Sequence, residues 1–208
     1  MKKLLGRLMR RLVVAITGAS GAIFGVRLLR LLRAQGGIET HLVVSKAAAL
    51  TLSAECSLSP AGVAALADHT HASGNIGAPI SSGSFRTDGM IVAPCSIRTA
   101  SAIATGVTDG LVSRAADVML KERRRLLLAI RETPLHAGHL ETLATLARLG
   151  AIIFPPVPGF YGRPETLEEM VDHSCMRMLD QFGIHTDVAP RWGEADGIAA
   201  FGAREAGA

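Results

Sequence analysis

The chain has 208 residues, enough for one domain, and 49% of them are hydrophobic although only 4% are aromatic. A core built mainly from Ala, Val, Ile and Leu is typical of layered α/β proteins and argues against an all-β fold. The net charge is +4, yet no stripe of Lys and Arg alternates with aromatic residues, so the sequence favours a small anionic ligand over nucleic acid.

The chain opens with a basic stretch, which is followed by an apolar run at residues 12–16. This run is too short for the apolar part of a signal peptide, and no run of about 18 apolar residues occurs anywhere, so we expect no membrane span. We predict a basic extension at residues 1–10, one domain at residues 11–194 and a C-terminal tail at residues 195–208.

Short apolar runs rich in β-branched residues alternate with helical patterns along the domain. The predicted strands, which resemble buried parallel strands, cover residues 12–16, 38–44, 90–93, 126–130 and 151–154. The predicted helices cover residues 22–34, 46–53, 97–104, 115–124, 139–149 and 166–182, the last one capped by Gly183. This alternation predicts an α/β fold with a mainly parallel, doubly wound sheet.

Each predicted strand is followed by small, hydroxylated or charged residues, where doubly wound sheets bind their ligands. The glycines of the first such loop, Gly18, Gly21 and Gly25, are three and four residues apart. This spacing differs from the GxGxxG fingerprint of dinucleotide sites, so NAD binding is disfavoured. The Gly- and Ser-rich segment at residues 73–89 is predicted to be a mobile active-site loop.

Three hydroxyl residues, Ser45, Ser96 and Thr99, open predicted helices. Each one alone is best interpreted as a helix N-cap that contributes about 1 kcal/mol. Together, at one edge of the sheet, they also form a cradle suited to the phosphate and ribityl chain of flavin mononucleotide (FMN), and the two roles are compatible. Arg131 and Glu132 follow a predicted strand directly, and this position favours a functional role for both charges.

The three cysteines, Cys56, Cys95 and Cys175, are scattered and lack CxxC spacing. This pattern indicates free thiols in a reducing compartment, so we expect a cytoplasmic location. Cys95 follows Pro94 at a strand end and is either a nucleophile or a small buried residue. We favour the buried residue, because no histidine is marked as its partner.

His136, His139 and Glu141 lie close together in the sequence, but no further ligand at a diagnostic spacing accompanies them. We therefore predict surface or capping histidines and no metal site. The sole tyrosine, Tyr161, is followed at position 165 by Glu rather than Lys. A short-chain dehydrogenase would carry a Tyr-xxx-Lys pair, so the sequence argues against that class.

Several motifs occur in order along residues 11–194: ITGASGAIFGVRLL, VVSKAA, SSGSF, PCSIRT, DGLVSRAADVMLKERR, RETPLHAGHLE, PPVPGFYGRP, DQFGI and PRWGE. In this combination the chain resembles the UbiX/Pad-type flavin prenyltransferases. The resemblance implies a Rossmann-like or flavodoxin-like three-layer sandwich, and a homo-oligomer, a dodecamer, whose active sites lie at subunit contacts.

The implied activity is metal-independent transfer of a dimethylallyl group from dimethylallyl phosphate to N5 and C6 of reduced FMN. The absence of DDxxD-like carboxylate clusters agrees with a monophosphate donor. The product, prenylated FMN, is expected to pass to a separate UbiD-type decarboxylase. Two alternatives stay open: an FMN-dependent cysteine decarboxylase of the same superfamily, and a non-catalytic FMN carrier.

The resemblance also implies roles for individual residues. The implied FMN contacts are Gly18, Ala19, Ser20, Ser45, Ser96, Ile97, Arg98, Thr99 and Arg131. The implied contacts of dimethylallyl phosphate are Tyr161, Arg177, Lys121 and Arg114. The implied catalytic residues are Glu132, which takes a proton near flavin N5, and Ser20, Glu55 and Lys121. Arg177 lies in the predicted last helix and is expected to reach the site of a neighbouring subunit.

Overall fold

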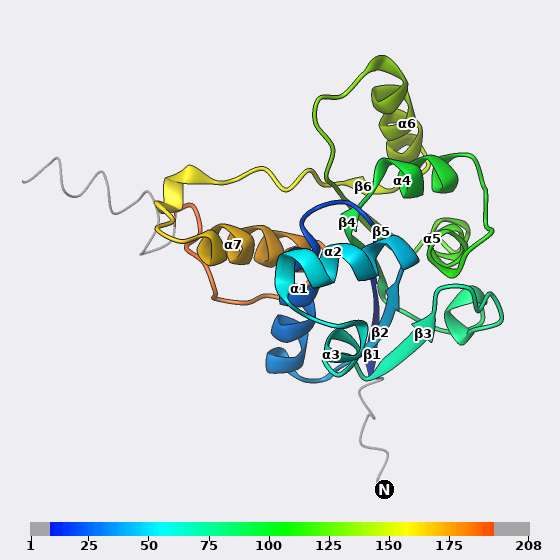
Figure 1. The fold of residues 1–208 in the computed structure, drawn as a ribbon, viewed down its shortest axis with the longest axis horizontal. Coiled ribbons are helices and arrows are strands. Elements are labelled where there is room, and N and C mark those ends of the chain that lie inside the picture. Colours follow the sequence, from blue (N-terminus) through cyan, green and yellow to red (C-terminus); the bar gives the residue numbers. More distant parts are fainter. Residues whose placement is uncertain (1–8, 194–208) are drawn as a thin grey trace, which may run out of the picture.

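Six parallel strands form one central sheet in the order β3-β2-β1-β4-β5-β6 (Figure 1). The computed structural model describes residues 9–193, so most of the predicted extension and the predicted tail at residues 195–208 lie outside the described residues. The strands are β1 (Arg10–Ile16), β2 (Ile38–Val44), β3 (His69–Ala72), β4 (Gly89–Cys95), β5 (Arg125–Ile130) and β6 (Ile152–Ile153). The strand order reverses between β1 and β4, which creates a topological switch point there.

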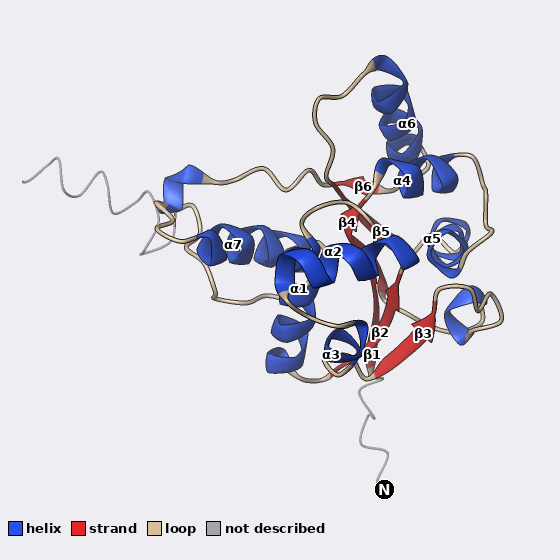
Figure 2. Ribbon diagram, viewed as in Figure 1, coloured by secondary structure: helices blue, strands red, loops and turns tan. Residues whose placement is uncertain are grey.

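Helices cover both faces of the sheet, as Figure 2 shows. One face carries α1 (Ala22–Gln35), α2 (Lys46–Cys56), α3 (Pro60–Ala64) and α7 (Leu167–Asp180). The other face carries the 3₁₀ turn η1 (Pro79–Ser81), α4 (Ile97–Ala104), α5 (Leu111–Lys121) and α6 (Ala137–Arg148). The predicted three-layer, flavodoxin-like α/β sandwich is therefore confirmed.

The alternation of side chains along the strands builds a separate core on each face. In β1, Leu12, Val14 and Ile16 face the α1 and α7 layer. Val13 and Ala15 face the α4 and α5 layer. All five side chains are almost completely buried, as expected for a parallel strand that is covered on both faces.

Strand β3 is absent from the predicted elements, because its sequence, His-Thr-His-Ala, carries no apolar run. It forms only because its backbone pairs in parallel with β2, in a register that places His69 opposite His41. The sheet therefore has six strands instead of the predicted five, and the polar strand lies at its edge.

Several predicted helices have boundaries that differ from the observed ones, among them α2, α5, α6 and α7. The pattern predicts a helix over residues 115–124, whereas α5 begins at Leu111, because Leu111 and Val112 are buried in the core. Soon after α5 ends, Arg123 adopts a left-handed φ of 53°. The last helix ends at Asp180 and is capped by Gln181, so Gly183 (φ 63°) lies beyond the cap instead of forming it.

Hydrogen bonds anchor the segment at residues 73–89 to α5 and to the turn that follows it. Arg114 Nε donates to the Ser81 carbonyl at 3.2 Å. Arg124 donates to the carbonyls of Phe85 at 2.7 Å and Gly83 at 2.6 Å. The mobility expected of this segment stays a prediction. Within residues 9–193, none of the helices combines the length and the apolar character needed to cross a bilayer.

Candidate functional site at the carboxyl edge of the sheet

Helices α1, α2 and α4 begin at the carboxyl ends of β1, β2 and β4, around the switch point (Figure 1). Ser45 caps α2 by accepting a hydrogen bond from the Ala48 N–H at 3.2 Å. Ser96 caps α4 by accepting one from the Thr99 N–H at 3.3 Å. The predicted capping roles of both serines are therefore confirmed.

Thr99 is not a cap, contrary to the prediction, because it is the third residue of α4. Its hydroxyl lies 3.0 Å from the Ser96 hydroxyl, so the two form a pair at the start of the helix. Ile97 and Arg98 occupy the first two positions of α4, with Ile97 half-buried and Arg98 exposed. The helix therefore presents amides, two hydroxyls and one guanidinium at the edge where a ligand would bind.

Thr17 ties the first loop to the loop after β4, and sequence reasoning did not single it out. Its hydroxyl donates to the Pro94 carbonyl at 2.7 Å and accepts from the Ser96 N–H at 2.8 Å. Gly18 then packs so closely on Ala47 at the start of α2 that a Cβ at position 18 would collide with it. The only sequence signal for this junction is the Thr-Gly pair at the end of a strand.

Glu55 reaches from α2 to the start of α1 and occupies two of its free amides. Its Oε2 accepts from the Gly21 N–H at 2.8 Å and from the Ala22 N–H at 3.0 Å. The free amides of a helix start generally favour a phosphate, whereas these two already bind a carboxylate. An anion bound at the first loop would therefore contact the backbone N–H groups of Gly18, Ala19 and Ser20 instead.

The environment of Glu55 keeps its carboxylate ionised. Burial alone would raise the pKa of Glu55, but hydrogen bonds from Gly21, from the Ser20 hydroxyl and from Ala22 outweigh it, and the positive charge of Arg131 adds to them. The pKa of Glu55 therefore lies below its ordinary value. Two predicted site residues, Ser20 and Arg131, thus interact with a third, Glu55, at the carboxyl edge, one through a hydrogen bond and the other through its charge.

Arg131 and Glu132 follow β5 directly, at the predicted edge, and both side chains are exposed. The Arg131 N–H donates to the Cys95 carbonyl at 3.3 Å, which joins the loops after β4 and β5. Burial raises the pKa of the Cys95 thiol far above its ordinary value. Cys95 is therefore the small buried residue that we favoured, because a thiolate nucleophile is not available there.

Lys121 and Glu132 lie at opposite ends of β5 within one chain. Lys121 ends α5, near the amino end of β5, which begins at Arg125, and it pairs with Glu122. Glu132 follows the last residue of the strand, and six residues of strand span about 20 Å. Arg114, one turn into α5, donates to the Ser81 carbonyl and pairs with Asp117 at 2.8 Å. A single chain therefore does not bring Lys121 to Glu132.

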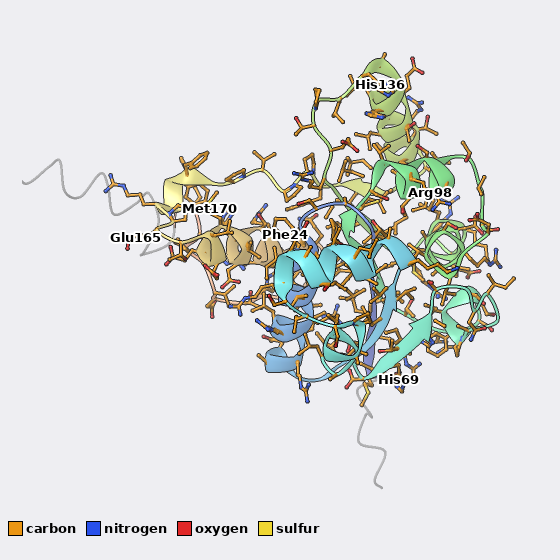
Figure 3. The ribbon with its side chains drawn as sticks, in the orientation of Figure 1. Phe24, His69, Arg98, His136, Glu165 and Met170 are labelled. Carbon is orange, nitrogen blue, oxygen red and sulfur yellow. The ribbon has the colours of Figure 1, made fainter. Side chains whose placement is uncertain are left out.

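Tyr161 and Arg177 form a third location beside α7. The segment after β6 runs away from α6 to a 3₁₀ turn, η2 (Phe160–Gly162), near the start of α7 (Figure 1). In Figure 3, Glu165 and Met170 mark this region, and Arg98 and His136 lie well away from it. One chain therefore holds the predicted phosphate contacts in separate places.

His173 is a partner of Tyr161 that sequence reasoning missed. Its Nε2 lies 2.7 Å from the Tyr161 hydroxyl, and the two rings meet edge to face. Burial, together with the charges of Arg177 and Arg191, lowers the pKa of His173. In the neutral tautomer that carries its proton on Nδ1, Nε2 accepts a hydrogen bond from the Tyr161 hydroxyl. The only sequence signal was the four-residue spacing of His173 and Arg177, which places both on one face of α7.

The histidines and cysteines singled out in the sequence lie in three separate environments. The rings of His136 and His139 lie against one another with centroids 3.6 Å apart and planes tilted by 33°, and neither histidine belongs to a group that could hold a metal among residues 9–193. A different group, on β2 and β3, does converge, although we expected no metal site. The predicted free cysteines are confirmed, since Cys56, Cys95 and Cys175 form no disulfide.

Comparisons with known proteins agree with this geometry. Residues 6–179 match the flavoprotein family. The chain is 56% identical over 186 residues to the flavin prenyltransferase UbiX of Escherichia coli, an alignment that covers 88% of this chain and 98% of that protein. It is also 53% identical over 183 residues to a mitochondrial flavin prenyltransferase of Saccharomyces cerevisiae, with 88% of this chain and 75% of that protein covered.

Two solved structures have the same fold at high identity. One is a UbiX protein in complex with FMN and dimethylallyl pyrophosphate, with a TM-score of 0.87 and 52% identity over 89% of this chain and 98% of that one. The other is a dodecameric FMN-dependent UbiX-like decarboxylase from Escherichia coli, with a TM-score of 0.87 and 52% identity over 88% of this chain and 100% of that one. An FMN-dependent cysteine decarboxylase matches at 15% identity and a TM-score of 0.60, a likeness of fold alone.

Proposed function

The chain belongs to the flavoprotein family and, within it, to the UbiX-type flavin prenyltransferases, and on this premise we propose that it prenylates reduced FMN with dimethylallyl phosphate. Its activity is that of a transferase that uses FMN. The observation that carries the proposal is the match at 52% identity to a protein solved with both FMN and a dimethylallyl pyrophosphate.

The carboxyl edge fits FMN. Gly18 leaves no room for a side chain, so the first loop lies directly against the start of α2. Hydroxyls of Ser45, Ser96 and Thr99 surround two helix N-termini there, and their partial positive charge favours a phosphate. We assign the FMN contacts to this cradle, together with Ala19, Ser20, Ile97, Arg98 and Arg131.

Reduced FMN supplies two nucleophilic atoms, N5 and C6. N5 bonds to C1 of the prenyl group as the phosphate leaves with the electron pair of its C–O bond, and C6 bonds to C3 as the prenyl double bond takes up a proton at C2. The residues of the chain assist by holding the phosphate, since each charge-assisted hydrogen bond contributes about 1.5–3 kcal/mol. We assign this task to Arg114, Lys121, Tyr161 and Arg177.

Protons leave the flavin as the two bonds form, so the site needs a base. We assign Glu132 to the proton of N5, because this exposed carboxylate stands at the carboxyl edge beside Arg131. Ser20 and Glu55 form a second acid-base pair, in which the Ser20 hydroxyl is hydrogen-bonded to an ionised carboxylate. This pair, with Lys121, is suited to move a proton toward or away from the departing phosphate.

The site needs more than one copy of the chain. The proposed phosphate contacts lie along α5 and beside α7, whereas Glu132 and the flavin cradle lie at the carboxyl edge, and one copy does not bring all of them together. We infer a homo-oligomer, a dodecamer like the solved UbiX-like relative, in which neighbours complete each site. We further propose that the chain acts in the cytosol and passes its product to a UbiD-type decarboxylase.

One anaerobic incubation tests the reaction. The protein is mixed with reduced FMN and dimethylallyl phosphate, and a parallel sample receives dimethylallyl diphosphate in its place. The mass of the released flavin is then measured by mass spectrometry. We expect the flavin to gain one five-carbon unit, faster with the monophosphate. Bound flavin of unchanged mass with both donors would instead identify an FMN carrier. In a separate incubation with oxidised FMN as the electron acceptor, oxidative loss of CO₂ from a C-terminal cysteine peptide would identify a cysteine decarboxylase.

A further inference from the structure

A cluster of histidines lies at the amino end of the sheet, opposite the flavin edge. We call Glu39, His41, His69 and His71 the His–Glu cluster. Glu39 and His41 are two residues apart on β2, as are His69 and His71 on β3, so each pair faces the same side of the sheet. The parallel register places His69 opposite His41. In Figure 3, His69 lies at the far end of the molecule from Arg98 and His136.

Three of these side chains converge on one point. One ligand atom each of Glu39, His41 and His69 lies within 4.8 Å of the others. His41 Nε2 is 2.9 Å and His69 Nε2 is 3.5 Å from Glu39 Oε1. A tetrahedral zinc ion with nitrogen and oxygen ligands at about 2.0–2.2 Å sets its ligand atoms roughly 3.3–3.5 Å apart. The cluster therefore needs only small side-chain movements to reach that geometry.

His71 acts as the outer partner of His41. Its Nε2 lies 2.9 Å from His41 Nδ1, and the two rings are almost parallel, at 3°. In the tautomer in which His41 Nδ1–H donates to His71, the lone pair of His41 Nε2 points at the Glu39 carboxylate, whereas in the other tautomer Nε2–H donates to that carboxylate. The first tautomer leaves two facing lone pairs, which a cation between them would stabilise, and a metal-bound histidine characteristically donates its other N–H to such an outer partner.

The burial of the cluster suits a metal site with one open position. The side chains of His41 and Glu39 are only 4% and 16% exposed, whereas His69 is 53% exposed and closes the site from the solvent side. Two ligands on a paired strand are held in place, and water can fill the fourth position.

We propose that Glu39, His41 and His69 bind a divalent transition metal ion of the Zn²⁺ type, with His71 as the outer-shell partner. The ion fastens the edge strand β3 to β2. It lies at the other end of the strands from the flavin cradle, so it has no part in prenyl transfer.

Arg11 competes with the ion. Its Nε donates to Glu39 Oε1 at 3.0 Å, and its guanidinium lies over the ring of Phe85 at 5.0 Å. Without the metal, Arg11 neutralises the carboxylate. With the metal, it must share or release that oxygen. Removing Arg11 therefore strengthens metal binding, an effect opposite in sign to that of removing a ligand.

Calorimetric titration of the full chain, freed of any histidine tag, with Zn²⁺ tests the proposal. We expect one ion per chain and weakening by about tenfold or more in His69→Ala and in Glu39→Gln, since even outer-shell partners account for roughly 10–100-fold. Arg11→Ala is expected to bind more tightly. Co²⁺ in place of Zn²⁺ is expected to show the visible absorption of a tetrahedral site, which His69→Ala loses.

His185→Ala is the matched control, because His185 is an exposed histidine that contacts Asp180 instead of the cluster. It is expected to bind Zn²⁺ as the parent chain does. Circular dichroism checks that each variant is folded, and exposed His69 is the safest ligand to remove. No zinc binding by the parent chain, or binding that His69→Ala and Glu39→Gln leave unchanged, would overturn the proposal.

Discussion

At the scale of single residues, Glu132 is the proposed base at flavin N5. Glu132→Gln keeps the size of the side chain and removes its ability to take a proton. We expect FMN affinity to stay within about twofold and product formation to slow by roughly 10²–10⁴-fold, the usual contribution of general-base catalysis. Flavin fluorescence titration and single-turnover mass spectrometry measure the two quantities. Loss of FMN binding would show that Glu132 holds the flavin instead.

His173 is expected to position Tyr161 for the prenyl phosphate. His173→Phe removes the acceptor of the Tyr161 hydroxyl and keeps an aromatic ring. Because one neutral hydrogen bond contributes about 1 kcal/mol, KM for dimethylallyl phosphate should rise roughly fivefold with little change in FMN affinity.

Tyr161→Phe should cause a similar increase in KM, and combining it with His173→Phe should add little, since the two side chains share one bond. Fully additive effects in the double variant would show that His173 and Tyr161 act independently. His173→Gln, which keeps an acceptor, provides a rescue control.

The lowered pKa of Glu55 predicts how stability depends on pH. A carboxyl with a lowered folded-state pKa contributes stability that is fully present above its unfolded pKa, about 4.3, and is lost as pH falls through the folded value. We expect Glu55→Gln to lower the free energy of unfolding by about 0.3–1 kcal/mol near pH 7, the effect of a carboxylate at a helix N-terminus. Urea unfolding should show this difference shrinking in acid below the folded pKa. A difference that grows in acid would contradict the assignment.

At the scale of elements, Arg27 and Asp172 join α1 to α7 through two hydrogen bonds, one of them Arg27 Nη2 to Asp172 Oδ2 at 2.7 Å. Asp172 is 9% exposed, so a variant without Arg27 leaves a carboxylate nearly buried and unpaired. We expect Arg27→Met to lower the free energy of unfolding by roughly 1–3 kcal/mol. Arg30→Met, at an exposed position of the same helix, should change it little. Equal losses in urea unfolding would mean that the pair contributes nothing.

The predictable elements are those whose own sequence carries the apolar pattern and the capping residues that mark a strand or a helix. Strands such as Ile38–Val44 and helices such as Ile97–Ala104 were predicted to the residue, because apolar runs and N-caps mark their ends. Strand β3 was missed because only pairing with β2 makes a strand of His-Thr-His-Ala. The carboxyl-edge residues were predictable from topology, whereas the contacts of Glu55 with α1 and of His173 with Tyr161 join segments whose proximity no local pattern encodes.

At the scale of the whole molecule, mixed assembly tests whether the site is shared between subunits. Glu132→Gln and Arg177→Ala are each expected to be inactive or nearly so when expressed alone. If neighbours supply Arg177, random assembly of equal amounts should restore roughly one quarter of the parent activity, because about one site in four receives both intact residues. Co-expression with two different tags isolates the mixed particles, and no restoration would place both residues in the same chain's site.

The sheet ends on both sides in short strands. Strand β3 has four residues, most of them polar, and β6 is only two residues long. Such ends offer too little backbone for another sheet to continue the pairing. In the proposed homo-oligomer, copies of the chain would therefore meet through helices and loops, which is compatible with a closed, symmetric shell, and the short edge strands limit growth into open-ended fibrils.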